Sequence, residues 1–273
     1  MAPKTDFPPV RACLFDVDGL LLNTEDLYTF CVNLVLQKYN RAPLPWSIKA
    51  KLQGRPAPEA NRIFSDWAKL PISDAQYKDE LSAFQTNHFP GAKPLPGVRE
   101  LLSALATAKT CKNEKVHMAL ATSSHAGNFA LKTAHLPDVF SVFPSERRVL
   151  GDDSRLGPGR GKPLPDIFLL ALKTINESLG PDERPITTEE CLVFEDSIPG
   201  VEAGRRAGMR VVWVPHPRLK DEVIGREEYI LAGLTGEAGP VHMHKLGEVD
   251  DGWAEELRTL AGFPFEKYGI VPV

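Results

Sequence analysis

Short apolar runs alternate with stretches of helical periodicity along most of this chain. We expect buried strands at 10–15, 116–121, 191–195 and 210–214, where apolar runs end at polar or turn-forming residues. We expect helices at 98–108, 126–135, 166–178 and 199–207, where apolar positions recur with helical spacing. Strands and helices that alternate in this way are typical of βαβ units, so the pattern predicts an α/β fold with a parallel, Rossmann-like sheet.

The segment between the first two predicted strands carries helical signals alone. A helix-start pattern occupies 23–26, and Ser73-x-x-Gln76 is a capping-box pattern that opens a further helix. The segment closes at a Pro- and Gly-rich linker, residues 90–97. We therefore expect a discontinuous α/β core of residues 1–22 and 96–273, and a separate all-helical unit of residues 23–95, here called the helical insertion.

The last part of the chain gives weaker signals. The spacing of Trp253, Leu257 and Leu260 predicts one more helix packed on the core. His242 and His244, two residues apart, favour an edge strand over a metal site.

Composition narrows the classes of protein that fit. The chain of 273 residues is 25% charged and 42% hydrophobic, as is ordinary for a soluble globular protein. Its net charge of −4 argues against binding a nucleic acid polymer, which needs a basic face, and no apolar run is long enough to span a membrane. Four cysteines without C-x-x-C spacing fit a reducing compartment, so we expect a cytoplasmic protein. We also expect a monomer, with a dimer as the alternative.

Two aspartates follow the first predicted strand. Asp16 and Asp18 are two residues apart, and Gly19 then allows a sharp turn. Carboxylates this close repel each other unless a cation or a shared task holds them. Oxygen ligands of this kind suit Mg²⁺, which is commonly shared with a substrate phosphate. An EF-hand is excluded, because Leu20 and Leu21 occupy the fifth and sixth positions of such a loop. The loop therefore indicates phosphate chemistry.

Further polar residues follow the other predicted strands. Thr122-Ser123-Ser124 ends one strand and Glu195-Asp196 ends another, while Lys162 precedes the helix at 166–178. In open α/β sheets, ligands bind at the carboxyl ends of the strands, so we expect these groups to meet. Asp16 and Asp196 can then hold Mg²⁺ from two strands with Glu195 in support. Thr122 and nearby backbone N–H groups can bind phosphate oxygens, and Lys162 supplies positive charge.

These groups of polar residues, in this order along the chain, resemble the motifs of the haloacid dehalogenase (HAD) superfamily. The resemblance covers nearly the whole chain to about residue 217. The matches are Asp16-x-Asp18-Gly19, the strand end at Thr122, Lys162-Pro163-x-Pro165-Asp166 and Glu195-Asp196. The helical insertion resembles the superfamily's helical C1 cap. The stretches Ala119-Leu-Ala-Thr-Ser-Ser and Cys191-Leu-Val-Phe-Glu-Asp are similar to the pseudouridine-5'-phosphatase branch.

The resemblance implies a Mg²⁺-dependent phosphatase that works through an aspartyl-phosphate. Asp16 would attack phosphorus, and Asp18 would protonate the leaving alcohol and then activate water. The metal would be held by Asp16, the backbone carbonyl of Asp18 and Asp196. Lys162 and Thr122 would steady the transferring phosphoryl group.

Enzymes of this superfamily with other activities differ from this chain at single positions. A dehalogenase normally lacks the second loop aspartate, whereas Asp18 is present. Mutases similar to β-phosphoglucomutase carry a His four residues after a Thr and a Lys in the cap patch. Here Tyr28 follows Thr24 at that spacing, and Gln53 takes the place of the lysine, so hydrolysis is favoured and transfer stays an alternative. A non-catalytic regulatory protein is disfavoured, because the nucleophile is intact.

The leaving group is left open by the sequence. Similarity makes pseudouridine 5'-phosphate or a related nucleotide monophosphate the first candidate, with sugar or polyol phosphates as the alternative. Any of them would be a small phosphorylated metabolite bound by residues of the core and of the helical insertion. The candidates for substrate binding are Gly19, Ser123, Ser124, His125, Asn128, Gln53 and Arg55, with Lys51 beside them.

Overall fold

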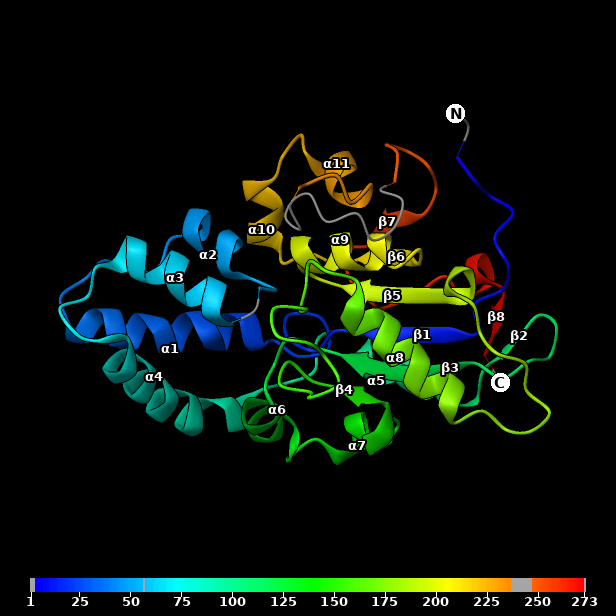
Figure 1. The fold of residues 1–273 in the computed structure, drawn as a ribbon, viewed down its shortest axis with the longest axis horizontal. Helices are drawn as coiled ribbons and strands as arrows, with labels where there is room; N and C mark the ends of the chain where they lie inside the picture. The colour runs from blue at the N-terminus through cyan, green and yellow to red at the C-terminus, as the bar shows by residue number, and fades with distance from the viewer. Residues whose placement is uncertain (1–2, 56, 237–246, 273) are drawn as a thin grey trace.

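A parallel six-stranded sheet forms the centre of the computed structural model, which describes residues 3–55, 57–236 and 247–272 (Figure 1). Its strand order is β4-β3-β1-β5-β6-β7. In chain order these strands are β1 (Ala12–Phe15), β3 (His117–Ala121), β4 (Arg148–Val149), β5 (Cys191–Glu195), β6 (Arg210–Trp213) and β7 (Ala254–Glu256). A small antiparallel sheet pairs β2 (Lys109–Thr110) with β8 (Ile270–Val271).

The register of the sheet brings the predicted polar residues to one edge. Phe15, the last residue of β1, is paired with Leu120 of β3 and Phe194 of β5. The residues that follow each strand therefore leave the sheet at the same level, at its carboxyl end. This edge carries Asp16, Thr122 and Asp196, as expected for an open α/β sheet.

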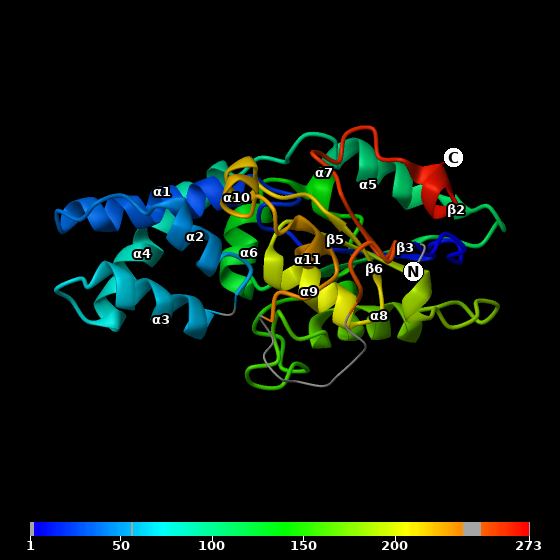
Figure 2. The same ribbon diagram turned by 90° about the horizontal axis from the view of Figure 1, so that it is seen from above.

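Helices cover both faces of the sheet (Figure 2). Cys13 and Phe15 pack in a core with α5 and the C-terminal segment, whereas Ala12 and Leu14 pack in a second core with α8 and α9. This alternation follows from the two-residue period of a strand. The helices of this part of the chain are α5 (Val98–Thr107), α6 (Ala126–Thr133), α7 (Pro137–Phe140), α8 (Asp166–Glu177), α9 (Ile198–Arg206), α10 (Pro217–Glu222) and α11 (Glu227–Leu231). Short 3-10 turns are η2 (Ser145–Arg147), η3 (Thr188–Glu190) and η4 (Phe265–Tyr268).

The helical insertion forms a bundle beside the carboxyl end of the sheet (Figure 1). It comprises α1 (Thr24–Lys38), α2 (Trp46–Leu52), α3 (Ala57–Ala68), α4 (Asp74–His88) and the turn η1 (Phe89–Gly91). Val35, Phe64 and Tyr77 pack in its own apolar core. The Ser73 hydroxyl accepts a bond from the N–H of Gln76, as the capping pattern predicts.

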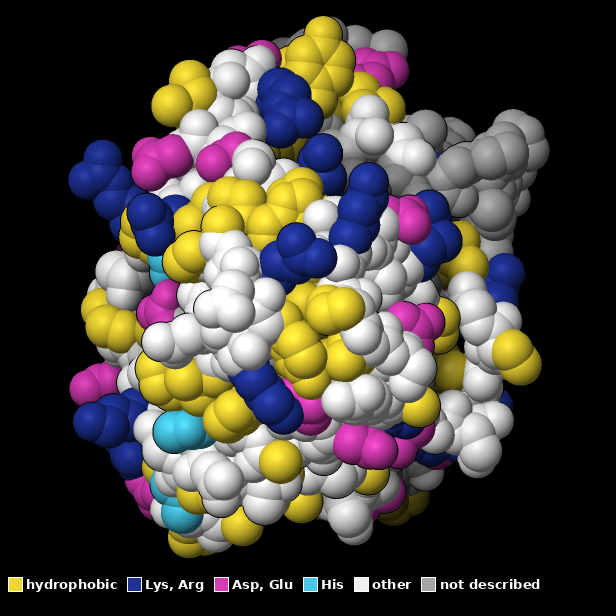
Figure 3. Space-filling model, turned by 90° about the vertical axis from the view of Figure 1, so that its left-hand side faces the viewer, with side chains coloured by type: hydrophobic (Ala, Val, Ile, Leu, Met, Phe, Trp, Pro, Cys, Tyr) yellow, Lys and Arg dark blue, Asp and Glu magenta, His cyan; other side chains and the backbone are white. Residues whose placement is uncertain are grey.

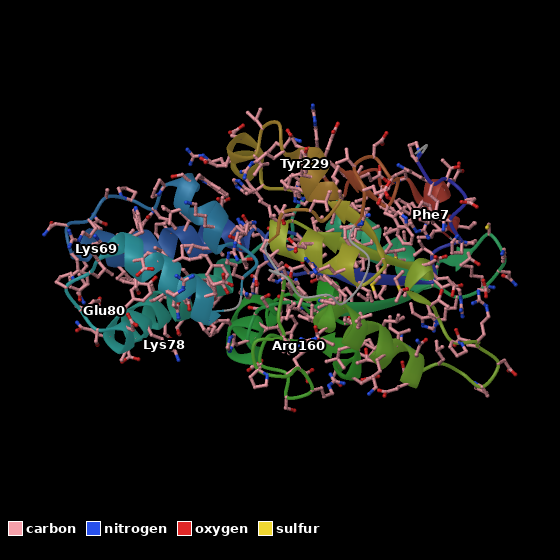
Figure 4. The ribbon with its side chains drawn as sticks, turned by 45° about the horizontal axis from the view of Figure 1, so that its top comes forward. Phe7, Lys69, Lys78, Glu80, Arg160 and Tyr229 are labelled. Atoms are coloured by element: carbon pink, nitrogen blue, oxygen red, sulfur yellow. The ribbon has the colours of Figure 1, made fainter. Side chains whose placement is uncertain are left out.

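Two neighbouring segments of the chain connect the bundle to the sheet. Asn23 and Lys93 exchange backbone and side-chain hydrogen bonds, and the N–H of Leu95 donates to the carbonyl of Leu21 at 3.0 Å. Figure 4 shows Lys69, Lys78 and Glu80 on the bundle and Phe7 at the opposite end of the molecule. The two covalent connections between bundle and sheet therefore run side by side near the strand ends.

One predicted element is wrong and one lies outside the described residues. Instead of a helix over Trp253 to Leu260, the chain forms β7, which extends the sheet beside β6. The exposed edge of β6 offers backbone groups that a strand can pair and a helix cannot, and the N–H of Leu257 donates to the carbonyl of Trp213. The strand proposed at His242 and His244 falls in residues 237–246, outside the described chain.

The surface at the end formed by the bundle carries both signs of charge. Lysine and arginine side chains alternate there with acidic and hydrophobic ones (Figure 3). Within the described residues, none of the helices has both the length and the apolar character needed to cross a membrane.

Candidate active site

Asp16 is held at the end of β1 by a buried lysine. The Nζ of Lys162, in the loop before α8, lies 2.5 Å from Oδ1 of Asp16 and 2.6 Å from Oε1 of Glu195. Lys162 is 1% exposed and Glu195 fully buried. Residues from three separate segments thus meet at the carboxyl edge of the sheet, as the sequence predicts.

Glu195 is engaged on both of its oxygens. Besides Lys162, it accepts bonds from the N–H groups of Asp196 and Ser197 and from the Ser197 hydroxyl, at 3.0–3.1 Å. Gly200 leaves room for this carboxylate, because a Cβ there would overlap it. This arrangement suits a group that supports the site from behind.

Negative charge in the site exceeds the positive charge beside it. Asp16, Asp18, Glu195 and Asp196 face two lysines, Lys162 and Lys132. Burial raises the pKa of Asp16 to about 7, helped by Glu195 and Asp18 and opposed by Lys162. Burial, followed by Glu195 and Glu25, raises the pKa of Asp196 well above its ordinary value. When all four carboxylates are ionised, the two ammonium groups leave two negative charges, which one divalent cation would balance.

The donor set fits Mg²⁺. Asp16 and Asp196 supply carboxylate oxygens from neighbouring strands, and the backbone carbonyl of Asp18 is the third expected donor. Among the described residues, no group of three or more His, Cys, Asp or Glu side chains is placed to hold a metal ion by itself. Mg²⁺ does not need one, because it is usually bound through one or two carboxylates and keeps waters for the substrate phosphate to replace.

Asp18 is bound by groups on both sides of the junction between sheet and bundle. Its Oδ1 accepts a bond from the Thr24 hydroxyl at 2.6 Å, and both of its oxygens accept from Lys132 Nζ, at 2.6 and 2.7 Å. Burial disfavours the ionised form, but Lys132 and the hydrogen bonds outweigh it and hold the pKa of Asp18 below its ordinary value. Asp18 is therefore ionised at neutral pH.

Lys132 is the residue that sequence reasoning missed. It lies on α6, is fully buried, and also contacts Ser124 and Tyr28. A signal was present: Phe129, Lys132 and Thr133 share the buried face of this helix. A lysine on such a face needs a partner of opposite charge.

The loop after α2 reaches from the bundle onto the core. Gln53 donates a hydrogen bond to Asp196, and Gly54 accepts one from the Ser123 hydroxyl at 3.3 Å. Gly54 has a φ of +74°, and a Cβ there would overlap Ser197. Gly19 is similarly required, because at a φ of +80° its Cβ would overlap Asp196.

The other predicted site residues lie at differing distances from this centre. Thr122 is buried, and its hydroxyl accepts a bond from the N–H of Ser124 at 3.2 Å, while His125 is exposed at the start of α6. Asn128 donates to Gln85 of the bundle at 3.5 Å. Arg55 binds the Lys51 carbonyl and the Glu59 carboxylate within the helical insertion, and Lys51 is exposed. Substrate contact by these residues stays a prediction.

A family model for haloacid dehalogenase-like hydrolases matches residues 10–208. The chain belongs to this family. It is 44% identical to a probable pseudouridine-5'-phosphatase of Saccharomyces cerevisiae, over 87% of this chain and 97% of the relative. It is 34% identical to (DL)-glycerol-3-phosphatase 1, mitochondrial, of Arabidopsis thaliana, over 81% of this chain and 69% of the relative. The predicted superfamily and its α/β fold are confirmed.

Solved structures of this hydrolase family share the fold. A family IA, variant 3 HAD hydrolase of Entamoeba histolytica superposes with a TM-score of 0.63 over 95% of this chain and 97% of that one, at 22% identity.

Proposed function

We propose that this protein is a Mg²⁺-dependent phosphatase that cleaves a small phosphomonoester through a phosphoryl group carried on Asp16. The observation that carries this proposal is the Asp16–Lys162–Glu195 cluster beside Asp196, with Asp18 held separately by Lys132. Phosphoryl transfer through an aspartate requires a nucleophile with a positive charge beside it and carboxylates that bind the metal. It also requires a separate carboxylate that acts as acid and base.

In the first step, a carboxylate oxygen of Asp16 attacks phosphorus and the bond to the ester oxygen breaks. Asp18, which is ionised in the ester-free site, would have to be protonated as the ester binds and would then give that proton to the departing alcohol. Lys162 stabilises the charge on Asp16 and on the transferring group. When bound to Asp16, Asp196 and the Asp18 carbonyl, Mg²⁺ would neutralise charge on the phosphate oxygens.

In the second step, Asp18 takes a proton from a water molecule that attacks phosphorus. The bond between phosphorus and Asp16 breaks, so that inorganic phosphate leaves and Asp16 is restored. The ionised Asp18 carboxylate is the form that this step needs.

The helical insertion would act as a cap over this site. Residues 1–22 and 96–273 would form the catalytic domain, and residues 23–95 the cap that excludes water while the ester reacts. The paired chain connections at Asn23 and Lys93 and the docking of Gln53 and Gly54 on the core support this division. Free thiols at all four cysteines support a reducing compartment such as the cytoplasm.

Pseudouridine 5'-phosphate is the first candidate substrate, because the yeast relative at 44% identity carries that activity in its name. A polyol phosphate is the second candidate, because the plant relative is named a glycerol-3-phosphatase. Mutase activity is disfavoured by Tyr28, whose hydroxyl is bound to Lys132.

Phosphate release with Mg²⁺ across a panel of esters tests the proposal. The panel would hold pseudouridine 5'-phosphate, UMP, glycerol 3-phosphate and hexose 6-phosphates, with β-glucose 1-phosphate followed for isomerisation. One ester preferred in kcat/KM by about a hundredfold would identify the leaving group, since that ratio corresponds to about 3 kcal/mol of differential binding. No release from any ester would contradict the phosphatase proposal.

A further inference from the structure

Each of the two loop aspartates has a buried lysine of its own. Lys162 approaches Asp16 from the loop before α8, and Lys132 approaches Asp18 from α6. The first pair belongs to the phosphoryl-transfer centre. The second has no assigned role in it, although Lys132 is the more completely enclosed lysine, with no exposed surface.

Stability alone does not account for Lys132. A buried ion pair pays a large desolvation cost, and apolar residues of similar volume often serve the fold equally well. Two aromatic rings also flank the ammonium group, whose Nζ lies 5.1 Å from the ring centre of Tyr28 and 5.5 Å from that of Phe89. The buried positive charge of Lys132 therefore points to a functional role.

The contacts of Lys132 fix the orientation of Asp18. One ammonium group donates to both carboxylate oxygens, at 2.6 and 2.7 Å, and to the hydroxyl of Ser124 at 2.5 Å. The Thr24 hydroxyl holds the same carboxylate from the first turn of α1. With both oxygens engaged, the carboxylate cannot rotate about its Cβ–Cγ bond without losing a charge-assisted hydrogen bond.

The same lysine joins the helical insertion to the core. Tyr28 on α1 and Phe89 in η1 belong to the first and last elements of the insertion, and they also stack edge to face on each other at 4.8 Å. Lys132 contacts the Tyr28 hydroxyl at 3.2 Å from the core side. Movement of the insertion at its junction would therefore shift Lys132 and, through it, the carboxylate of Asp18.

We propose that Lys132 is a positioning residue for the acid–base carboxylate Asp18, and that it links the placement of Asp18 to the seating of the helical insertion. This inference rests on the proposed phosphatase function. Lys132 would touch neither the phosphoryl group nor the leaving alcohol. Its loss would slow both steps that use Asp18 and leave binding of the ester nearly unchanged.

The test compares Lys132→Met with wild type on the preferred ester and on 4-nitrophenyl phosphate, whose leaving group departs without protonation. We expect kcat on the preferred ester to fall at least tenfold with KM changed less than about threefold, because acid–base catalysis contributes about a hundredfold or more. On the nitrophenyl ester we expect a burst of about one nitrophenol per enzyme, because attack by water on phosphorylated Asp16 becomes slow. Retained kcat with no burst would overturn the proposal.

Two further variants separate positioning from a structural role. Arg11→Met removes a buried cation, paired with Glu190 at the opposite edge of the sheet, and we expect neither the fall in kcat nor the burst. Lys132→Ala with added ethylammonium should recover kcat in a saturable way, whereas an equal concentration of a neutral alcohol should not. If both variants at 132 fail to fold, Lys132→Gln decides, because it keeps a polar side chain and removes the charge beside Asp18: wild-type kcat with no burst in that variant overturns the proposal. Wild-type protein that releases no phosphate from any ester would instead contradict the proposed function itself.

Discussion

Gln53, in the loop after α2, donates a hydrogen bond to the carboxylate of Asp196, which follows strand β5. Both side chains are buried, and Gln53 Oε1 has no hydrogen-bond partner among the described residues. One amide group thus spans from the helical insertion to an expected metal ligand, with an acceptor left for a bound molecule. We therefore expect catalysis to depend on whether this loop is docked on the core.

The substitution Gly54→Ala should unseat this loop. An added Cβ would overlap Ser197 and force a side chain into the left-handed region at a φ of +74°. We expect kcat/KM to fall about tenfold to a hundredfold, because small displacements of positioning groups cost that much. Steady-state kinetics on the preferred ester measure the effect.

Gly225→Ala is the matched control for that variant. Gly225 has a φ of +79°, but a Cβ there meets nothing within 4 Å. We expect the same backbone penalty, about 1–2 kcal/mol of unfolding free energy, with unchanged kcat/KM. Equal kinetic losses in the two variants would show that strain, not docking, is responsible.

Asp196→Asn should change stability in opposite directions with and without Mg²⁺. The pKa of Asp196 is higher in the folded than in the unfolded chain, so ionised Asp196 destabilises the metal-free fold increasingly as pH rises above about 4. At pH 7 we expect the metal-free variant to melt at or above the wild-type temperature. We also expect it to lose the stabilisation by Mg²⁺, about 2.7 kcal/mol when the metal is at a hundred times its Kd.

Thermal melts with EDTA and with Mg²⁺ measure both effects. Asp79→Asn, on an exposed position of α4, should respond to Mg²⁺ as wild type does. If Asp196→Asn is stabilised by Mg²⁺ as strongly as wild type, Asp196 is not a ligand. EDTA should also remove activity from wild type, and added Mg²⁺ should restore it.

His117 should make the fold sensitive to mild acid. Its Nδ1 faces the Arg147 guanidinium at 3.1 Å and its Nε2 faces Glu183 at 2.6 Å, an arrangement that requires a neutral ring with its proton on Nε2. Burial lowers the pKa of His117 below 6.5. The unfolded chain therefore takes up this proton first, and stability should fall as pH drops below 6.5.

His117→Gln would reveal that dependence in urea unfolding between pH 5 and pH 8. We expect the variant to be less stable than wild type by about 1 kcal/mol at pH 8, through weakened hydrogen bonding. The difference should shrink toward pH 5. A difference that is constant across this range would mean that His117 does not titrate there.

The placement of the candidate site residues could be predicted where they follow strand ends. Asp16, Thr122 and Asp196 each follow an apolar run, and parallel register brings such positions to one edge whatever the details of packing. Lys162 was predictable for a related reason, since it precedes the next helix at the same edge.

Features that depend on tertiary contacts were not predictable in this way. The position of Lys132 is explained by its contact with Asp18, which lies 114 residues away in the chain. The spacing of Trp253, Leu257 and Leu260 satisfies a helix, yet the edge of β6 selects a strand there. Strand β4 is only two residues long and gives no pattern of its own.

A phosphoryl group trapped on Asp16 would test the central claim most directly. Asp18→Asn, incubated with Mg²⁺ and 4-nitrophenyl phosphate and quenched in acid, should retain one phosphoryl group, because the leaving group needs no acid while attack by water needs a base. Peptide mass spectrometry should locate that group on Asp16, and Asp16→Asn should carry none and show no turnover. A label on another residue, or turnover retained by Asp16→Asn, would contradict the account.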